Sequence, residues 1–201
     1  MKVQVFVVGN LATNCYMVSC SETKTAIVID PGFTSMREAQ NILNHIESNQ
    51  LSVKLVINTH GHEDHICGNI FFKKKYGIPI YIHKYDAPLA AGSVDEALPA
   101  IVYLNEGDAI EFGEAKLRVM HSPGHSLGSI CLLGEKLIFT GDTLFAGGIG
   151  RTDFLGGAMS DMKMSLERLL LLPERLVVYP GHGPATTIGE EKRCNPFLHW
   201  L

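Results

Sequence analysis

The sequence has no long apolar run, no large excess of positive or negative charge, and no paired cysteine spacing. No apolar run approaches the ~18 residues that a membrane-spanning helix requires, which argues against an integral membrane protein. The N-terminus does not resemble a signal peptide. Polar and apolar residues alternate at its start, within residues 1–8, and no small-residue cleavage site follows an apolar core. Five cysteines, an odd number without paired spacing, predict free thiols rather than a disulfide framework. These absences favour a cytoplasmic protein.

The charge balance argues against a nucleic-acid partner. Lysine and arginine number 17 against 21 aspartate and glutamate, which gives a formal net charge of -4. The one basic run, residues 73–75, is expected at the end of a helix, where the helix dipole favours it. A hydrophobic fraction of 46% in 201 residues is typical of a globular protein. Since no repeat or linker is visible, we expect one domain over residues 1–201.

The hydrophobic pattern predicts a mixture of strands and helices. Strands are expected at residues 2–8, 13–19, 25–29, 53–58, 78–82, 109–112, 116–120, 129–133, 136–140 and 176–179. Helices are expected from about Ser35, which can form a capping box with Glu38, over residues 68–75, and in an amphipathic segment opened by Ser160. Residues 83–104 and 146–157 predict loops, the first with short helical pieces between its prolines. The alternation of predicted strands and helices along the chain indicates a sheet with helices packed against it.

The densest polar cluster lies at residues 59–65, directly after the predicted strand 53–58. It contains three histidines and two acidic residues: His60, His62, Glu63, Asp64 and His65. Unpaired buried polar groups cost about 2–7 kcal/mol each, and protonated imidazoles this close would repel one another. Neutral histidine is the commonest metal ligand, and carboxylate can complete the set. The cluster therefore predicts a metal site.

Three further polar residues share one layout, in which a strand is followed by a glycine turn and then by His or Asp. These are His125, Asp142 and His182. Taken singly, each is more often a turn or capping residue. Taken with the first cluster, they complete seven candidate ligands: His60, His62, Asp64, His65, His125, Asp142 and His182. Seven ligands suffice for two metal ions about 3.5–4 Å apart with one bridging carboxylate.

Residues 60–65 carry the HxHxDH pattern and resemble the metallo-β-lactamase superfamily, whose later motifs match the positions of His125, Asp142 and His182. The closer resemblance is to the glyoxalase II branch. It extends over residues 13–16, 30–32, 122–126, 141–145, 181–184, 186–190 and 195–197. The resemblance implies an α/β fold of four layers, an αβ/βα sandwich of two mixed sheets with helices on the outer faces.

The resemblance also implies roles for the candidate ligands. His60, His62 and His125 would bind a first divalent metal ion, and Asp64, His65 and His182 a second, with Asp142 as the bridge. Zinc is the expected metal, with iron or manganese as alternatives. The implied enzyme is a binuclear hydrolase in which a metal-bound hydroxide attacks a small-molecule thioester of the hydroxyacylglutathione type, or a related acyl ester. Asp64 would orient the hydroxide and could take its proton.

One departure concerns substrate recognition. Glyoxalase II enzymes add a C-terminal helical domain that forms much of the glutathione site, whereas this chain ends at Leu201. Arg151 matches a substrate-contacting basic residue of the family, and an ion pair with Asp153 is an equally good interpretation. Asp30 is expected to cap a turn, with support of a metal-bound histidine as the alternative. Cys67 is expected to fill space rather than to bind metal.

Two other functions compete with hydrolysis. A persulfide dioxygenase, a branch of the same superfamily with a single iron, resembles this chain at residues 150–154, and would bind its iron through the equivalents of His60, His125 and Asp142. A non-catalytic metal-binding protein is less favoured, because all seven ligands are present.

Overall fold

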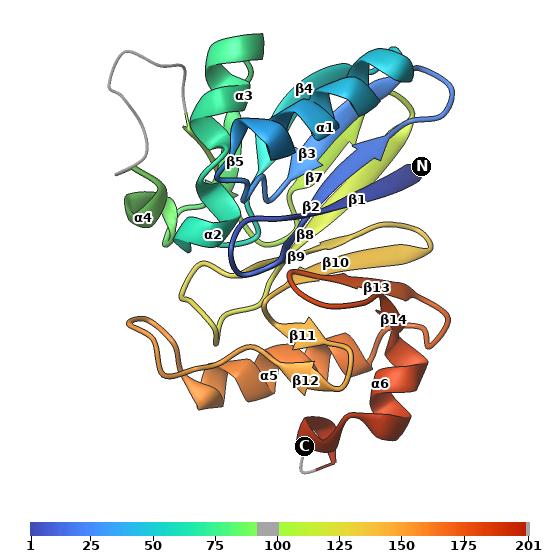
Figure 1. The fold of residues 1–201 in the computed structure, drawn as a ribbon. Coiled ribbons are helices and arrows are strands. Elements are labelled where there is room, and N and C mark those ends of the chain that lie inside the picture. Colours follow the sequence, from blue (N-terminus) through green and yellow to red (C-terminus); the bar gives the residue numbers. More distant parts are fainter. Residues whose placement is uncertain (92–100, 200–201) are drawn as a thin grey trace.

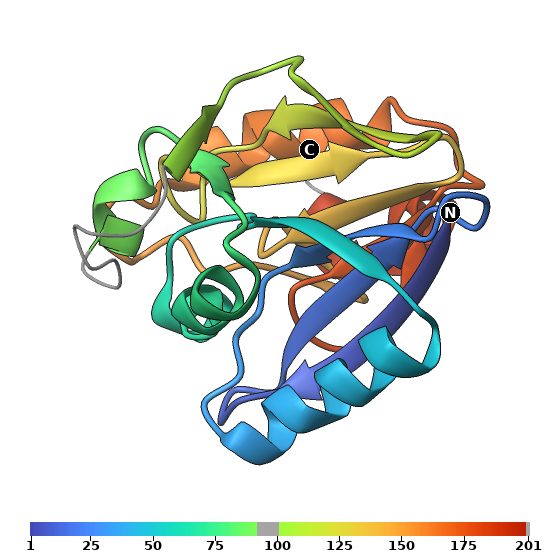
Figure 2. The ribbon, with the colours of Figure 1, turned by 90° about the horizontal axis from the view of Figure 1, so that it is seen from above.

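The computed structural model describes residues 1–91 and 101–199. Two six-stranded sheets lie face to face, and helices cover their outer faces (Figures 1 and 2). The first sheet contains, in spatial order, β1 (Lys2–Val8), β2 (Thr13–Ser19), β3 (Thr25–Ile29), β4 (Ser52–Ile57), β5 (Ile80–His83) and β6 (Ile101–Leu104). The second contains β14 (Thr186–Thr187), β13 (Val177–Pro180), β10 (Leu137–Gly141), β9 (Ile130–Leu133), β8 (Ala115–His121) and β7 (Ala109–Phe112).

The helices divide between the two sheets. Those of the N-terminal half are α1 (Met36–Ser48), α2 (Glu63–Ile66), α3 (Asn69–Tyr76) and α4 (Ala87–Ala91). Those of the C-terminal half are α5 (Met159–Leu170), α6 (Ile188–Cys194) and the 3-10 turn Pro196–Leu198. Figure 1 shows α1 and α3 outside the first sheet and α5 and α6 outside the second. The four-layer αβ/βα sandwich implied by the resemblance is therefore confirmed.

Three apolar layers hold this arrangement together. Between the sheets, side chains such as Ile27, Leu117 and Phe139 are fully buried. The outer layers pack α1 and α3 against the first sheet, and α5 and α6 against the second. Each fully buried Leu, Ile or Phe side chain contributes about 1.5–3 kcal/mol relative to an exposed one, so the three layers together stabilise the sandwich.

The N-terminus of α1 follows its sequence signal closely. Ser35 accepts a hydrogen bond from the backbone N–H of Glu38, and the Glu38 carboxylate accepts from the Ser35 N–H, which completes the predicted capping box. The Glu38 carboxylate also accepts from Gly9 N at 2.8 Å. The cap therefore ties the helix to the β1–β2 hairpin as well as starting it.

The sheet topology brings distant turns to one edge. Strands β3 to β6 run parallel, and so do β10 and β13, so their carboxyl ends face the same way. Strand β8 is two antiparallel steps from β10 and ends at that edge too. The predicted ligand segments follow β4, β8, β10 and β13. Polar side chains placed at strand ends in this way converge on one site.

Several local predictions were wrong. Ile101–Leu104 is a strand rather than part of a loop, because it pairs in parallel with β5 through Ile80 and its neighbours. Strands β11 (Leu144–Phe145) and β12 (Gly148–Ile149) form a small hairpin, whose second strand lies inside the loop expected at residues 146–157. Helix α5 begins at Met159 rather than being opened by Ser160. Its N-cap is Ala158, whose methyl side chain cannot form a capping hydrogen bond. Residues 92–100 of the expected loop lie outside the described residues. No helix among the described residues is long and apolar enough to cross a membrane.

Candidate metal centre

The structure brings all seven predicted ligands together at the shared sheet edge. His60 and His62 lie in the turn after β4, and Asp64 and His65 follow on the one-turn helix α2, which was not predicted. The other three come from turns of the second sheet, after β8, β10 and β13. Two backbone hydrogen bonds join the sheets here, from Asn14 N to Gly181 O at 2.7 Å and from Ile130 N to Thr59 O at 2.8 Å. The pocket is therefore held by both sheets.

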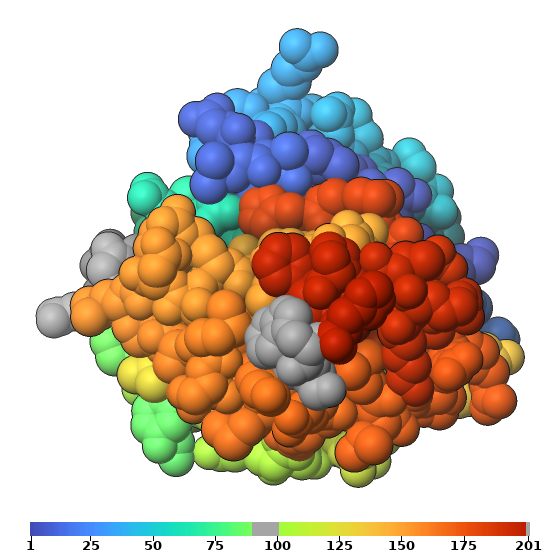
Figure 3. Space-filling view, turned by 90° about the horizontal axis from the view of Figure 1, so that it is seen from below, coloured from blue at the N-terminus to red at the C-terminus, as the bar shows by residue number. Residues whose placement is uncertain are grey.

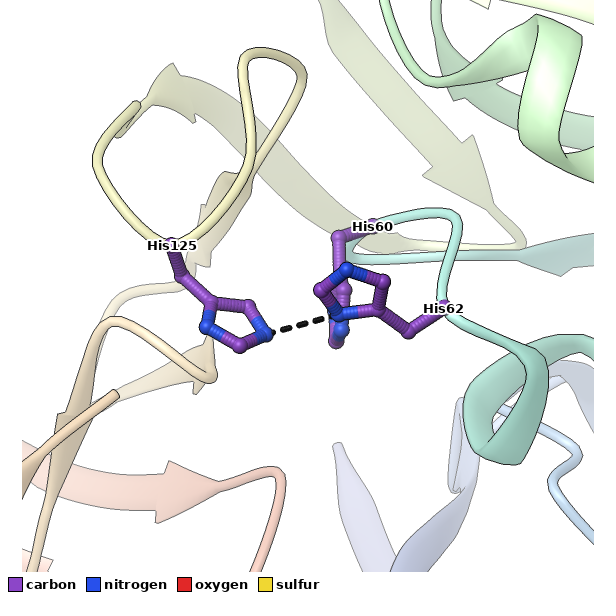
Figure 4. Close-up of side chains that lie close together, drawn as sticks. All are labelled: His60, His62 and His125. Carbon is purple, nitrogen blue, oxygen red and sulfur yellow. Dashed lines mark hydrogen bonds between the residues drawn. The ribbon is translucent and has the colours of Figure 1, made fainter. Parts of the chain in front are cut away.

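A first triad is formed by His60, His62 and His125, whose rings converge at nearly right angles to one another (Figure 4). His62 Nδ1 and His125 Nε2 lie 2.8 Å apart, and the ring centroids of His60 and His62 are separated by 4.7 Å. One ligand atom from each residue lies within 4.8 Å of the others. His125 Nδ1 donates to Arg151 O at 2.8 Å, which leaves Nε2 directed at the other imidazoles.

A second triad is formed by Asp64, His65 and His182. His182 Nε2 lies 3.3 Å from Asp64 Oδ2 and 3.3 Å from His65 Nε2. His182 Nδ1 donates to Leu11 O at 3.1 Å, so the β1–β2 hairpin holds this ring with Nε2 pointing inward. The hairpin thus supports a ligand that follows the last large strand of the other sheet.

Asp142 lies between the two triads. Its Oδ2 is 3.5 Å from His125 Nε2 and 3.5 Å from His182 Nε2, and its Oδ1 is 3.4 Å from His65 Nε2. A carboxylate that reaches histidines of both triads has the placement that a bridge between two cations requires.

The donor set fits metal ions. Among the described residues, the buried atoms His60 Nε2 and Asp142 Oδ1 have no hydrogen-bond partner, although such atoms are costly to leave unpaired. Burial, together with the neighbouring imidazoles, lowers the pKa of His60 and of His62. Both rings are therefore neutral near pH 7 and offer lone pairs to a cation. The role of the seven residues as metal ligands stays a prediction, and their geometry suits it.

The second triad attracts positive charge. Burial acts to lower the pKa of His65, but the carboxylates of Asp30, Asp142 and Asp64 outweigh it and raise that pKa to about 9. Burial acts to raise the pKa of Asp64, but a hydrogen bond from His182 and the charge of His65 hold it well below its usual range. Without metal, the carboxylates thus keep a proton on His65. A divalent cation would compete for the same negative charge.

Asp30 supports the site rather than merely capping a turn. His65 Nδ1 donates to Asp30 Oδ2 at 2.9 Å, and the Thr59 hydroxyl donates to the same oxygen at 2.6 Å. Thr59 N donates to Asp30 Oδ1 at 2.8 Å. The favoured expectation of a turn cap is therefore corrected, since this carboxylate fixes the ring of His65 and the chain before His60.

Asp86 was missed by the sequence analysis. Its buried carboxylate accepts from Gly61 N at 2.9 Å, from Ser126 Oγ at 2.6 Å and from Gly128 N at 2.7 Å. It therefore joins the loop of His60 and His62 to the loop of His125. A usable signal was present, because Asp86 follows the parallel strand β5 and lies at the start of α4. Asp86 was missed because residues 83–104 were expected to form a loop with short helical pieces.

Two glycines are needed for close backbone approach. A Cβ on Gly181 would collide with Asp142 Oδ1 and crowd His65. Gly141 has φ +48° and lies against the Thr59 side chain, so any larger residue would meet both strain and collision. Glycine at these turns therefore lets strands β10 and β13 end against residues 59–65, as the strand–glycine layout predicted.

The remaining residues singled out from sequence lie around the two triads. Arg151 borders the cavity and forms a two-point ion pair with Asp153, with both N–O distances 2.7 Å. Glu63 is exposed and belongs to none of the metal-capable clusters found among the described residues. Cys67 belongs to none of them either, and its Sγ donates to Glu63 O at 2.8 Å.

An open cavity of about 660 Å³ lies above the triads. Its floor consists of His62, Asp64, His125, Asp142 and His182, and its walls are mostly apolar. The cavity is large enough for a small organic substrate.

The chain is similar to known proteins along nearly its whole length. The sequence profile of the Metallo-beta-lactamase superfamily matches residues 8–182. The chain is 33% identical over 214 residues to the "Hydroxyacylglutathione hydrolase GloC" of Haemophilus influenzae, which covers 99% of both chains. It is similar to the structure of TTHA1623 "in a di-iron-bound form", with 34% identity and a TM-score of 0.84 over 98% of this chain and 100% of that one. It is also similar to the "BLEG-1 B3 metallo-beta-lactamase", with 31% identity and a TM-score of 0.85 over 98% of this chain and 100% of that one.

Proposed function

The chain belongs to the metallo-β-lactamase superfamily, and from this membership we propose that it is a binuclear hydrolase of acyl thioesters, of the hydroxyacylglutathione type or related esters. The observation that carries the proposal is the pair of triads with Asp142 between them. The similarity to a hydroxyacylglutathione hydrolase along nearly all of both chains supports the substrate class.

The imidazole and carboxylate donors suit zinc, and iron or manganese would also be accepted. When bound, two such ions would supply a hydroxide nucleophile at neutral pH and stabilise the oxyanion that develops on the substrate. The likeness to a di-iron structure supports a site for two ions and makes iron a metal to test.

Asp64 is the residue we propose to orient the attacking water at the cavity floor and to take its proton. Thr13 Oγ1 donates to Asp64 Oδ2 at 2.9 Å, which orients the carboxylate, and the lowered pKa keeps it ionised. An oriented, ionised carboxylate accepts a hydrogen bond from an attacking water and holds it in place, and it is near enough to take the proton. Since a thiolate leaves with little protonation, no separate general acid is required for a thioester.

The proposal is tested by metal analysis of protein purified without added metal, paired with a thioester panel that includes S-lactoylglutathione. We expect two equivalents of metal and hydrolysis of at least one thioester. His182→Gln should retain about one equivalent and lose most activity, whereas His45→Gln, on the outer helix α1, should change neither. Protein with two equivalents of zinc or iron that hydrolyses no thioester would contradict the proposal.

A mononuclear-iron persulfide dioxygenase is the second candidate, because residues 150–154 resemble that branch. It would bind one equivalent of iron and consume oxygen with glutathione persulfide. Measuring metal content and oxygen uptake on the same preparation separates the two enzymes. Bound metal with no turnover of either substrate would favour a non-catalytic metal-binding protein.

A further inference from the structure

Large apolar side chains surround the mouth of the cavity above the triads. They come from four separate parts of the chain: Leu11, Leu89, Phe145, Phe154 and Leu155. We call this set the apolar rim. Leu155 is 97% exposed and Leu11 is 66% exposed. Single exposed leucines are common on protein surfaces, but a group of five around one concave site marks a binding surface for apolar groups.

The apolar rim is continuous with the candidate metal ligands. The ring of Phe154 packs edge-on against His62, with centroids 5.2 Å apart, and Phe145 packs against His182 at 6.0 Å. Figure 3 shows the face on which the N-terminal segment (blue), the segment of the 150s (orange) and the segment near residue 180 (orange-red) meet. A substrate group that binds to the apolar rim therefore lies next to the candidate metal ligands.

Charge is scarce in the cavity wall. Arg151 is the one Lys or Arg side chain that lines it among the described residues. Its Nε and Nη2 both donate to the Asp153 carboxylate. Its guanidinium also stacks on Phe154, with Cζ 4.0 Å from the ring centroid. Arg151 thus packs against the apolar rim, and a carboxylate on the substrate would have to compete with Asp153 for it.

We propose that the apolar rim binds the acyl group of the substrate, so that among the acyl thioesters of the proposed function the enzyme prefers those with longer apolar acyl chains. The inference rests on the proposed thioesterase function and names its substrate class. The carbonyl carbon lies over the triads, the acyl chain lies against Leu11, Phe154 and Leu155, and the thiol part extends toward solvent. Hydrolysis adds water across the thioester bond and releases the carboxylic acid and the thiol.

The expected size of the preference follows from apolar burial. Each methylene that leaves water contributes about 0.8 kcal/mol when fully buried, which is roughly a fourfold effect per methylene. The cavity is open on one side, so we expect roughly twofold to fourfold per methylene. From acetyl to hexanoyl, kcat/KM should then rise by roughly 16-fold to 250-fold.

The test uses S-acyl-N-acetylcysteamine thioesters with acetyl, lactoyl, butanoyl and hexanoyl groups on the metal-loaded protein. We expect kcat/KM to rise with chain length and lactoyl to fall below butanoyl. Leu155→Ser combined with Leu11→Ser should lower the hexanoyl-to-acetyl ratio by roughly tenfold. Leu171→Ser is the matched control, because Leu171 is 87% exposed at the end of α5, outside the cavity lining, and should leave both rates unchanged.

Binding of uncleavable thioethers separates this inference from the proposed function. S-hexyl- and S-methyl-N-acetylcysteamine, measured by calorimetry, should differ in affinity in the same direction. If the thioethers show that difference and no thioester is cleaved, the rim stands and the thioesterase proposal fails. If thioesters are cleaved with no dependence on chain length, or if the double serine variant keeps the full preference, the rim inference is overturned.

Discussion

His65 Nδ1 lies 2.9 Å from Asp30 Oδ2, and this contact joins the turn after β3 to the short helix α2. Both residues are almost completely buried. The carboxylate accepts the Nδ1 proton of His65 and so turns Nε2 toward the second triad. A residue that touches no expected metal ion thereby controls a ligand.

Replacing Asp30 should therefore affect the second triad most. In Asp30→Asn, the amide still accepts from Thr59 N, but its NH₂ group cannot accept the proton of His65 Nδ1. We expect metal affinity at one of two sites to fall roughly 10-fold to 100-fold, as measured by competition with a chelating dye. Glu22→Gln, in the exposed turn between β2 and β3, serves as the control. Equal affinity in Asp30→Asn and wild type would show that Asp30 only caps its turn.

Glu63 and Asp64 offer a matched pair on the same helical turn. Glu63 is exposed, whereas Asp64 Oδ2 lies 3.3 Å from His182 Nε2. Glu63→Gln should keep both metal equivalents and normal activity, whereas Asp64→Asn should lose metal and most thioester hydrolysis. Metal content by mass spectrometry and kcat/KM on one thioester decide the point. Loss of metal in Glu63→Gln would show that the roles within residues 60–65 are assigned wrongly.

Sequence reasoning reached the candidate ligands, gave support of a ligand by Asp30 only as an alternative, and missed Asp86. Ligand residues such as His60 and His125 stand beside glycine or proline at predicted strand ends, so a local pattern identifies them. Asp30 was singled out beside Pro31-Gly32, but its partners His65 and Thr59 could not be read from sequence, because they lie 29 to 35 positions away. Asp86 follows a strand too, but its partners lie 25 to 42 positions away. Strand β6 was missed for the same reason, because its pairing with β5 lies in the tertiary structure.

Asp86 should matter to stability even without metal. Its buried carboxylate accepts three hydrogen bonds, two of them from the backbone of the loops that carry His62 and His125. Asp86→Ala leaves these donors without their partner, so we expect the free energy of unfolding of the metal-free protein to fall by about 2–4 kcal/mol. Urea unfolding measures the loss. Asp86→Asn, which keeps one carbonyl oxygen, should recover part of it, and a loss below about 0.5 kcal/mol in Asp86→Ala would contradict the bridging role.

His83 links stability to pH away from the two triads. It is 3% exposed, and its ring stacks on His121 with centroids 4.2 Å apart. Burial, followed by the charge of His121, lowers its pKa to about 4, while Asp86 acts to raise it and Lys84 to lower it. Its Nδ1 accepts from Tyr85 N, which requires a neutral nitrogen.

The pH window follows from this lowered pKa. In the unfolded chain histidine titrates near 6.5, so between about pH 6.5 and pH 4 the unfolded state binds the proton and the folded state does not. Stability from neutral His83 is therefore complete above about pH 6.5 and is lost as the pH falls toward 4. His83→Phe keeps a ring without a titrating nitrogen. Between pH 7 and pH 4.5, metal-free His83→Phe should lose less stability than wild type, by on the order of 1–2 kcal/mol in urea unfolding. His199→Phe, at an exposed site, should follow wild type, and an equally steep loss in His83→Phe would assign the acid sensitivity to other groups.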